Sequence, residues 1–435
     1  MMRLVARFAA LIALVPMACG STREVKPVGQ ASEGAVKPVA CPPELAMDHQ
    51  PLSAHEMQFF KPTEPKGTVS KHAVCATVRE RSLTLAVAID SAKADAKLPD
   101  LVRFDFTGKA DFTGAPVAPL KVDRNEDGEV ATTVGPATIE VKRDGKTIPV
   151  SVRGNYHKSP GYRWINLNFG TAVEGRLAFG DKTYAVRVVD GNNDLALGTK
   201  AQGLRAGDRV AGIEPCDALV VDTGDGSFAG KVLKAYYGQP VQVGGAWYDV
   251  ELSPDGAKLT AKPSAAETAS LKIAHARWAA KLAGEKYILT LSGSAEPAVI
   301  PADRYTIIEF EQTVPSDRPE DKEGWKGRLT SGRRDLWDGK GQTIEAAAGK
   351  TVELAIGAPL TASIVTSVQA PSQAPQKAGR PAPVAGSAVR MDFKLVDAAG
   401  LRAELFLPNA GAPTPEVEVF DAEGKSIHQA KFQFG

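Results

Sequence analysis

The sequence predicts an all-β protein built from about three serial β-sandwich or β-roll modules. Two observations support this fold class. Short segments alternate apolar and polar residues with a period of two, and glycine and proline punctuate the chain between them. There are 41 glycines and 30 prolines among 435 residues. Many short strands joined by tight turns are typical of stacked-sheet architectures.

The first 18 residues have the pattern of a secretory signal peptide. Arg3 and Arg7 flank the start of a short apolar run, Phe8 to Val15, which is too short to span a membrane. Cys19 then follows a small residue, as at the acylation site of bacterial lipoproteins, although Pro16 stands where that motif prefers leucine. We therefore expect export. Two outcomes stay open: lipidation of Cys19, which would anchor the chain to a membrane, or cleavage and release.

Two further segments lack hydrophobic periodicity and are rich in proline and small residues. Residues 19–45 are expected to form a disordered tether, and residues 369–386 a disordered linker or loop. They help to divide the chain into four expected units. These are a first β domain at 46–175, a β module with acidic turns at 176–264, a β-sandwich module at 265–368 and a C-terminal β segment at 387–435.

Individual strands follow from the alternation. An Asp-Gly pair at 144–145 lies between two alternating runs and predicts a hairpin. Residues 265–282 are the main helical candidate, but their apolar residues form no clear 3.6-residue stripe, which favours strands. The expected strands are Ser82–Ile89, Ala137–Val141, Ile148–Val152, Lys182–Val189, Trp247–Leu252, Tyr287–Leu291, Thr306–Phe310, Thr351–Ile356, Val389–Val396, Ala403–Leu407 and Val417–Phe420.

A turn-plus-strand segment recurs along the chain. Residues 179–188 align with residues 243–252, and residues 143–152 form a weaker third copy. Each copy has a tight glycine turn followed by an alternating strand. This repetition predicts related β modules in series.

Three acidic turns are candidate calcium sites. Asp123, Asn125 and Asp127 alternate and are followed by glycine, and Asp190, Asn192 and Asp194 repeat the alternation. The turn Asp222 to Gly226 is a shortened form. Ca²⁺ takes six to eight oxygen ligands, which a tight turn with oxygens at alternate positions helps to supply. Neither of the first two loops ends in the glutamate of an EF-hand, and the alternative is that these residues simply form turns.

Export also affects how the cysteines are interpreted, because disulfides form outside the cytoplasm. If Cys19 is acylated, Cys41, Cys75 and Cys216 remain. Cys41 and Cys75 are the candidates for a disulfide at the start of the first domain, and Cys216 is expected to be a buried small hydrophobe. Three unpaired thiols are the alternative.

Charge and motif content argue against several functions. The chain has 52 basic and 51 acidic residues, without the basic excess of a nucleic-acid-binding protein. The Gly-x-Ser-x-Gly, His-Glu-x-x-His and Cys-x-x-Cys patterns are absent, and the six histidines are scattered. We therefore expect no catalytic residues and no cofactor other than calcium.

The middle of the chain carries a family resemblance. Four segments form its pattern: an Asp/Asn/Gly turn, an Asp-flanked strand, a Gly-Asp-Gly turn and a Tyr-Tyr-Gly strand. They are Asp190–Asp194, Asp217–Asp222, Gly224–Gly226 and Tyr236–Gly245. With them, residues 184–262 resemble a β module of uncharacterised exported proteins from planctomycete-like bacteria. The last third, through Ile300–Tyr305 and Ala348–Leu354, resembles transthyretin-like β-sandwich modules. The resemblance implies export and β architecture, and no activity.

The sequence thus predicts a non-enzymatic, exported cell-envelope protein with a structural or binding role. Lipidation of Cys19 and stabilisation by calcium are the accompanying expectations. Its expected partners are the membrane, through the anchor, and an envelope protein or polysaccharide. One alternative is a carbohydrate-active hydrolase that uses carboxylates of the middle domain. Another is a periplasmic assembly factor that adds a partner strand to an exposed sheet edge.

Overall fold

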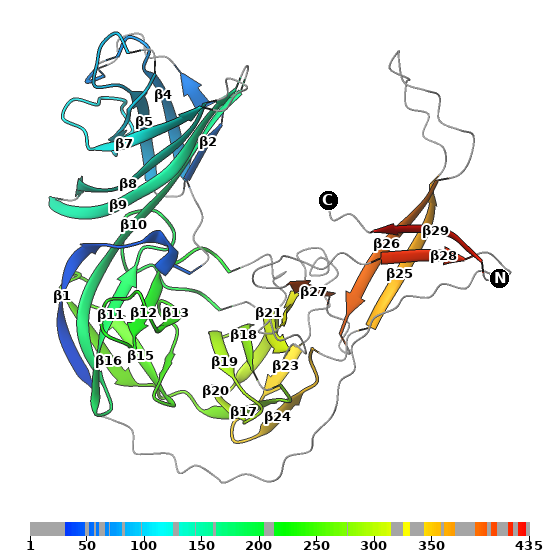
Figure 1. Ribbon diagram of the computed structural model, residues 1–435. Coiled ribbons are helices and arrows are strands. Elements are labelled where there is room, and N and C mark those ends of the chain that lie inside the picture. The colour runs from blue at the N-terminus through cyan, green and yellow to red at the C-terminus, as the bar shows by residue number, and fades with distance from the viewer. Residues whose placement is uncertain are drawn as a thin grey trace.

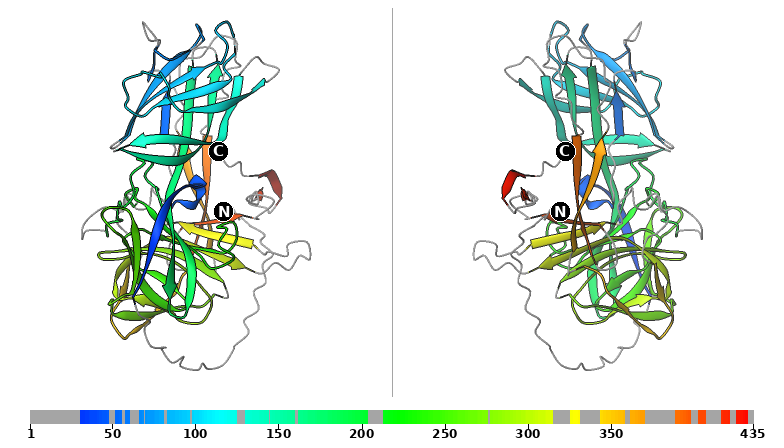
Figure 2. Two further views of the ribbon diagram at one scale, coloured as in Figure 1. Left: turned by 90° about the vertical axis from the view of Figure 1, so that its left-hand side faces the viewer. Right: turned by 90° about the vertical axis from the view of Figure 1, so that its right-hand side faces the viewer.

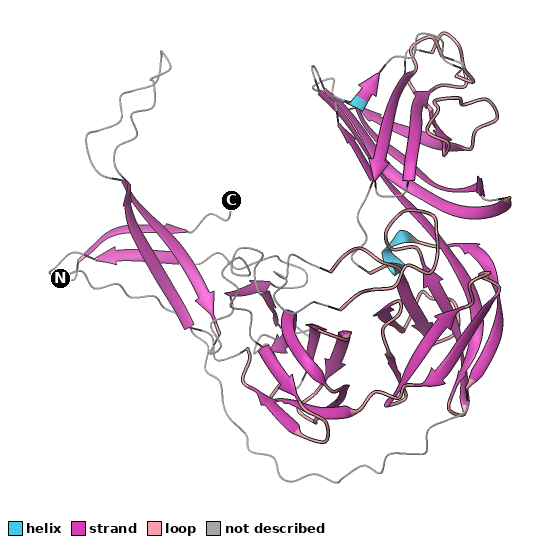
Figure 3. Cartoon of the chain, turned by 180° about the vertical axis from the view of Figure 1, so that it is seen from behind, coloured by secondary structure: helices cyan, strands magenta, loops and turns pink. Residues whose placement is uncertain are grey.

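The protein is all-β, which confirms the predicted fold class (Figure 1). The computed structural model describes residues 31–47, 52–55, 58–60, 66–68, 70–80, 83–96, 98–124, 130–143, 145–159, 162–203, 213–275, 277–314, 325–330, 343–357, 361–369, 388–397, 402–406, 416–420 and 425–431. These residues form strands β1 to β29 and the short 3₁₀ helix η1 (Pro43–Leu45). Figure 3 shows that nearly all of the secondary structure of the described residues consists of strands. Among the described residues, no helix has the length and apolar character needed to cross a membrane.

The first module is an antiparallel sheet that curls around its own core at the top of Figure 1. Its strands run in the order β10-β9-β8-β7-β6-β5-β4-β3, and β2 pairs with the other edge of β10. Phe104 and Phe169 meet edge-to-face in the core, with ring centroids 5.7 Å apart. The strands are β2 (Leu52–His55), β3 (Phe59–Phe60), β4 (Val74–Glu80), β5 (Leu83–Asp90), β6 (Leu101–Asp105), β7 (Val117–Arg124), β8 (Val130–Arg143), β9 (Lys146–Ser159) and β10 (Tyr162–Phe179).

Strand β10 belongs to two modules. Up to Gly170 it pairs with β9, and from Thr171 onward it pairs with β1 and then also with β11. A Cβ atom on Gly170 would overlap the carbonyl oxygen of Cys41, so glycine is needed where the chain after β1 crosses this point. The module boundary predicted between residues 175 and 176 therefore falls inside a continuous 18-residue strand.

The second module contains the rest of β10 together with β1 (Ser32–Ala40), β11 (Lys182–Val189), β12 (Ala218–Asp222), β13 (Val232–Tyr236), β14 (Val241–Val243), β15 (Ala246–Leu252) and β16 (Lys258–Pro263). β1 lies between β10 and β16 and pairs antiparallel with both. The prediction of a disordered tether over residues 19–45 is therefore wrong for Ser32–Ala40. Backbone hydrogen bonds to two neighbours hold this strand, and its few apolar side chains gave no visible period.

The repeated segments are hairpins with two-residue turns. Phe179 pairs with Lys182 across Gly180-Asp181, and Val243 pairs with Ala246 across two glycines. Both hairpins belong to the second module, where the ring of Tyr248 meets that of Phe179 edge-to-face at 5.0 Å. The repeat thus marks two packed hairpins of one module. The weaker copy is the β8–β9 hairpin of the first module, as the Asp-Gly turn predicted.

The third module is built around Leu271, Leu282, Tyr305 and Phe310. Its strands are β17 (Thr268–Ile273), β18 (Trp278–Gly284), β19 (Ile288–Gly293), β20 (Ala298–Pro301), β21 (Asp303–Val314), β22 (Trp325–Thr330), β23 (Thr343–Ala346) and β24 (Thr351–Leu354). The preference for strands over residues 265–282 is confirmed by β17 and β18.

The C-terminal residues form β25 (Thr361–Gln369), β26 (Ala388–Val396), β27 (Arg402–Phe406), β28 (Glu416–Phe420) and β29 (Ser426–Lys431). β27 pairs with β22 of the third module, so the segment predicted at 387–435 is partly continuous with its neighbour. The β25–β26 and β28–β29 hairpins extend away from the other strands (Figure 1), and Figure 2 shows the red C-terminal strand to one side of the modules. Of the predicted linker at 369–386, Gln369 ends β25 and the rest lies outside the described residues.

Candidate functional site

The acidic turn after β11 connects the first two modules through hydrogen bonds and one apolar contact. The Asp190 carboxylate accepts the backbone N–H of Asp194 at 3.3 Å and of Leu195 at 2.8 Å. Leu195 has a positive φ of 59° and packs in the core of the first module. Asn193 accepts the N–H of Phe169 on β10 at 3.2 Å. The carboxylate thus stabilises a tight loop that inserts an apolar side chain across the junction.

Two further aspartates close turns in the same way. Asp217 accepts backbone N–H groups from Gly191, Gly198 and Thr199 at 3.3, 2.6 and 2.9 Å. Asp222 accepts those of Gly224 and Phe228, both at 2.6 Å. Each carboxylate supplies the acceptors that a turn lacks when it has no β partner. The Asp-rich pattern that suggested metal ligands therefore has a local structural role in these turns.

Burial strongly affects the ionisation of the carboxyl groups of Asp190 and Asp217. Burial, and then the neighbouring Asp194 charge, raise the pKa of Asp190 to about 7, although backbone N–H groups oppose the shift. The pKa of Asp217 is also raised well above its usual value, by burial and by Asp190. A charge on Asp190 therefore disfavours the ionisation of Asp217.

The structure describes one of the two predicted sets of calcium ligands completely and the other only in part. Asp190, Asn192 and Asp194 are all buried, and the carboxylate of Asp190 is occupied by loop amides. Asp123 lies on β7 opposite Ala131, whereas Asn125 and Asp127 lie outside the described residues. Among the residues that the structure places, no group of three or more His, Cys, Asp or Glu side chains is arranged to hold a metal ion. Calcium at the Asp123 turn stays a prediction.

The predicted disulfide between Cys41 and Cys75 is not formed. Both are free, buried thiols in separate clusters, one beside η1 and one on β4. The hydrophobic environment of each site favours the neutral thiol, and burial is the main cause that raises both pKa values to about 12. Cys216 also forms no disulfide and is 2% exposed, as expected for a small buried hydrophobe. Cys19 lies outside the described residues.

A groove at the open end of the first module is the candidate ligand site. Its volume is about 330 Å³. Apolar walls come from Ile89 at the end of β5 and from the β5–β6 loop, and Tyr156 of β9 backs the groove. The lining residues are Ser70, His72, Ala73, Val74, Ile89, Asp90, Ala96, Leu98, Pro99, Tyr156, Lys158 and Arg163.

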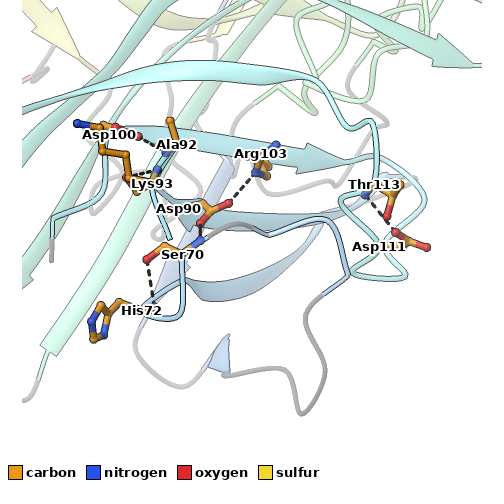
Figure 4. Close-up of polar contacts among 10 residues, drawn as sticks. Ser70, His72, Asp90, Ala92, Lys93, Asp100, Arg103, Asp111 and Thr113 are labelled. Atoms are coloured by element: carbon orange, nitrogen blue, oxygen red, sulfur yellow. Dashed lines mark hydrogen bonds and ion pairs between the residues drawn. The ribbon is translucent and has the colours of Figure 1, made fainter. Parts of the chain in front are cut away.

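One carboxylate lines this groove, and protein groups already hold it (Figure 4). The Asp90 side chain is fully buried, accepts Arg103 Nε at 2.7 Å and accepts the backbone N–H of Ser70 at 2.8 Å. Ser70 Oγ in turn accepts the backbone N–H of His72 at 3.1 Å. This network fixes the floor of the groove and the chain that leads into β4.

The loop on the other side of the groove is fixed by Asp100. Its carboxylate accepts the backbone N–H of Ala92 at 2.9 Å, and its own N–H donates to the carbonyl of Asp90 at 3.0 Å. Figure 4 shows this bond beside the Asp90–Arg103 pair. The groove is thus bordered by two segments whose backbone is hydrogen-bonded to the sheet, so it is preformed.

No family model, curated protein or solved structure matches this chain. The groove was not predicted from the sequence, because its residues come from four separate segments and match no motif. One signal was available: Lys158 and Arg163 flank the tight connection between two alternating runs, where a hairpin would place them side by side.

Proposed function

We propose that this chain is a non-enzymatic, exported protein of the cell envelope with a binding role, and that the groove of the first module is its ligand site. The observation that carries the proposal is the groove itself. It combines apolar walls with a few fixed polar groups, and its 330 Å³ lie within the range of ligand pockets. No comparison supplies a function, so the geometry is the basis of this proposal.

The arrangement of carboxylates supports binding more than glycoside hydrolysis. Hydrolysis uses two carboxyl groups about 5–10 Å apart that flank the bond to be cleaved. In the groove, the lining contains the single carboxylate of Asp90, which is buried and paired with Arg103. In the second module, Asp190 and Asp217 accept backbone N–H groups of their own loops. Neither place offers the acid and the nucleophile or base that this reaction needs.

Ligand binding can be tested on the full mature chain by screening neutral and anionic mono- and disaccharides in a thermal-shift assay. We expect hits whose binding is lost in Leu98→Trp, which fills the groove from its wall. Val299→Trp is the matched control, because Val299 is 38% exposed on β20 of the third module. Binding that survives Leu98→Trp, or a screen without any hit, would contradict the proposed site. Hits should be recovered chemically unchanged after incubation with the protein.

Export and anchoring are supported by the sequence pattern of residues 1–19, and they need a separate test. We expect the wild-type protein to partition into the detergent phase of a membrane extract, and Cys19→Ser to move it to the aqueous phase. Cys41→Ser is the control, since Cys41 is a buried thiol of the folded part. Equal partitioning of wild type and Cys19→Ser would overturn the anchor and leave the groove unaffected.

A further inference from the structure

Charged residues that face each other across the described ladders of the first three modules are mostly of opposite sign. Glu174 faces Arg187, with a 2.7 Å ion pair. Lys272 faces Glu353 at 2.6 Å, and Arg304 faces Glu345 at 2.9 Å. Opposite charges at such positions stabilise a sheet, and like charges destabilise it. The sheets thus follow a consistent charge rule.

Two cross-strand pairs in the described ladders break this rule: Arg143–Lys146 and Lys158–Arg163. The first pair lies at the contact with the second module. Arg143 donates to the carbonyl oxygen of Asp194, and Lys146 donates to that of Asp255 at 3.2 Å. Both cations therefore tie the β8–β9 hairpin to the second module. The second pair lies at the opposite end of β9.

Lys158 and Arg163 both line the groove. They sit directly opposite each other in the β9–β10 register, one step outward from the Tyr156–Ile165 pair on the same face. Tyr156 and Ile165 are buried, at 3% and 0% exposure, so this inner pair belongs to the core while the cations occupy the mouth. His157 and Trp164 stack on the other face of the sheet, with ring centroids 5.8 Å apart.

Among the charged residues that line the groove, together with Arg103 of its floor, cations outnumber carboxylates. Lys158, Arg163 and Arg103 contribute three cations, and Asp90 contributes one anion. Since Asp90 has no exposed side-chain surface and already accepts two hydrogen bonds, it does not offer a carboxylate at the mouth. His72 lies at the exposed rim of the groove.

We propose that the Lys158–Arg163 pair binds the oxyanion of a small organic ligand, a carboxylate, sulfate or phosphate group, at the mouth of this groove. Arginine presents a planar fork of donors to such a group and lysine a compact charge, so two adjacent cations suit one shared anion. The apolar walls then contact the uncharged body of the ligand. This inference rests on the proposed function and names the ligand class of the same site.

The like-charge pair makes a prediction that a structural role would not make. Where two cations face each other without a ligand, removing one relieves repulsion. Lys158→Gln should therefore keep or raise the melting temperature of the free protein while it weakens binding. A residue retained for stability would behave in the opposite way. Lys158 is exposed, so the substitution is compatible with folding.

The experiment is titration calorimetry of the full mature chain with digalacturonic acid, glucose 6-phosphate and neutral lactose, at low and at high salt. We expect the anionic probes to bind more tightly than lactose, and increasing salt to weaken them. Lys158→Gln and Arg163→Gln should each reduce anion affinity about tenfold or more, because a hydrogen bond to a charged group is lost. Lys146→Gln, from the other like-charge pair, should leave affinity unchanged.

Four outcomes would overturn the inference. The first is that lactose binds in the groove as tightly as both anionic probes. The second is that Lys158→Gln binds the anions with the affinity of the wild type, and the third is that Lys146→Gln loses as much anion affinity as Lys158→Gln. The fourth is that ligand-free Lys158→Gln melts at a lower temperature than the ligand-free wild type. In the first case the proposed binding function survives, provided that Leu98→Trp abolishes lactose binding. If none of the three probes binds, this inference is overturned, while the broader saccharide screen decides separately on the proposed function.

Discussion

Gln239 and Ile288 join the second and third modules through a buried hydrogen bond. The backbone N–H of Ile288 donates to Gln239 Oε1 at 2.9 Å, and Gln239 Nε2 donates to the carbonyl of Ala201 at 3.0 Å. The glutamine is 5% exposed and lies beside a small cluster that contains Tyr236, Ala283 and Ile288. One side chain thus satisfies backbone groups on both sides of the junction.

Replacing Gln239 with leucine should weaken this junction. The substitution leaves a buried N–H and a buried carbonyl without partners, and each costs about 1–3 kcal/mol. We expect a loss on the order of 2–4 kcal/mol in the free energy of unfolding, measured by urea denaturation. Gln242→Ala is the control, because its bond to the Val299 carbonyl is an exposed contact of 3.4 Å. Comparable losses in the two variants would contradict the role given to Gln239.

The buried Asp190 should make stability depend on pH. Its carboxyl ionises near its usual value of 3.8 in the unfolded chain and near 7 in the folded protein. Between these values the folded state binds the additional proton, so the free energy of unfolding decreases as pH rises from about 4 to about 7. Asp217, whose pKa is also raised, acts in the same direction.

Urea denaturation at pH 5 and pH 8 measures this effect. Wild type should be more stable at pH 5 as far as these two carboxyls are concerned, and Asp190→Asn should show a smaller difference between the two pH values. Asp255→Asn is the control, since Asp255 is exposed and its pKa is lowered by Ser253. A pH difference that is unchanged in Asp190→Asn would show that this carboxyl does not carry the effect.

Calcium dependence, if present, should be confined to the turn that begins at Asp123. The Asp190 carboxylate already accepts two loop amides, and no set of described side chains forms a metal cluster. A shift of melting temperature between calcium and EDTA should therefore persist in Asp190→Asn and vanish in Asp123→Ala. The reverse pattern would restore the second loop as a calcium site.

The cysteines should behave as inert thiols. Since burial raises the pKa values of Cys41 and Cys75 to about 12, the nucleophilic thiolate is scarce at neutral pH. Ellman's reagent should label three thiols of the Cys19→Ser protein in urea and almost none in the folded state. Dithiothreitol should leave the melting temperature unchanged. A drop after reduction would indicate a disulfide that the described structure does not contain.

Periodicity predicted the strands well because alternation is a local property. Lys182–Val189 was predicted with the bounds that β11 has, and Arg143 of β8 pairs with Lys146 of β9 as the Asp-Gly pair in the sequence predicted. The failures concern long-range partners. β1 was missed because its pairing with β10 and β16 uses the backbone, and the role of Asp190 was missed because Leu195 reaches another module's core. The groove combines four segments, and no local pattern reveals that.

The incorporation of β1 into the sheet shortens the linker between the proposed lipid anchor and the folded part of the protein. Between Cys19 and Ser32 lie residues 20–31, which reach at most about 40 Å, whereas a free segment extending to residue 45 would reach about 90 Å. β1 pairs with the later part of β10, and Arg163 stands near the start of that strand. Because β10 spans about 60 Å, the groove would stay within about 100 Å of the anchor.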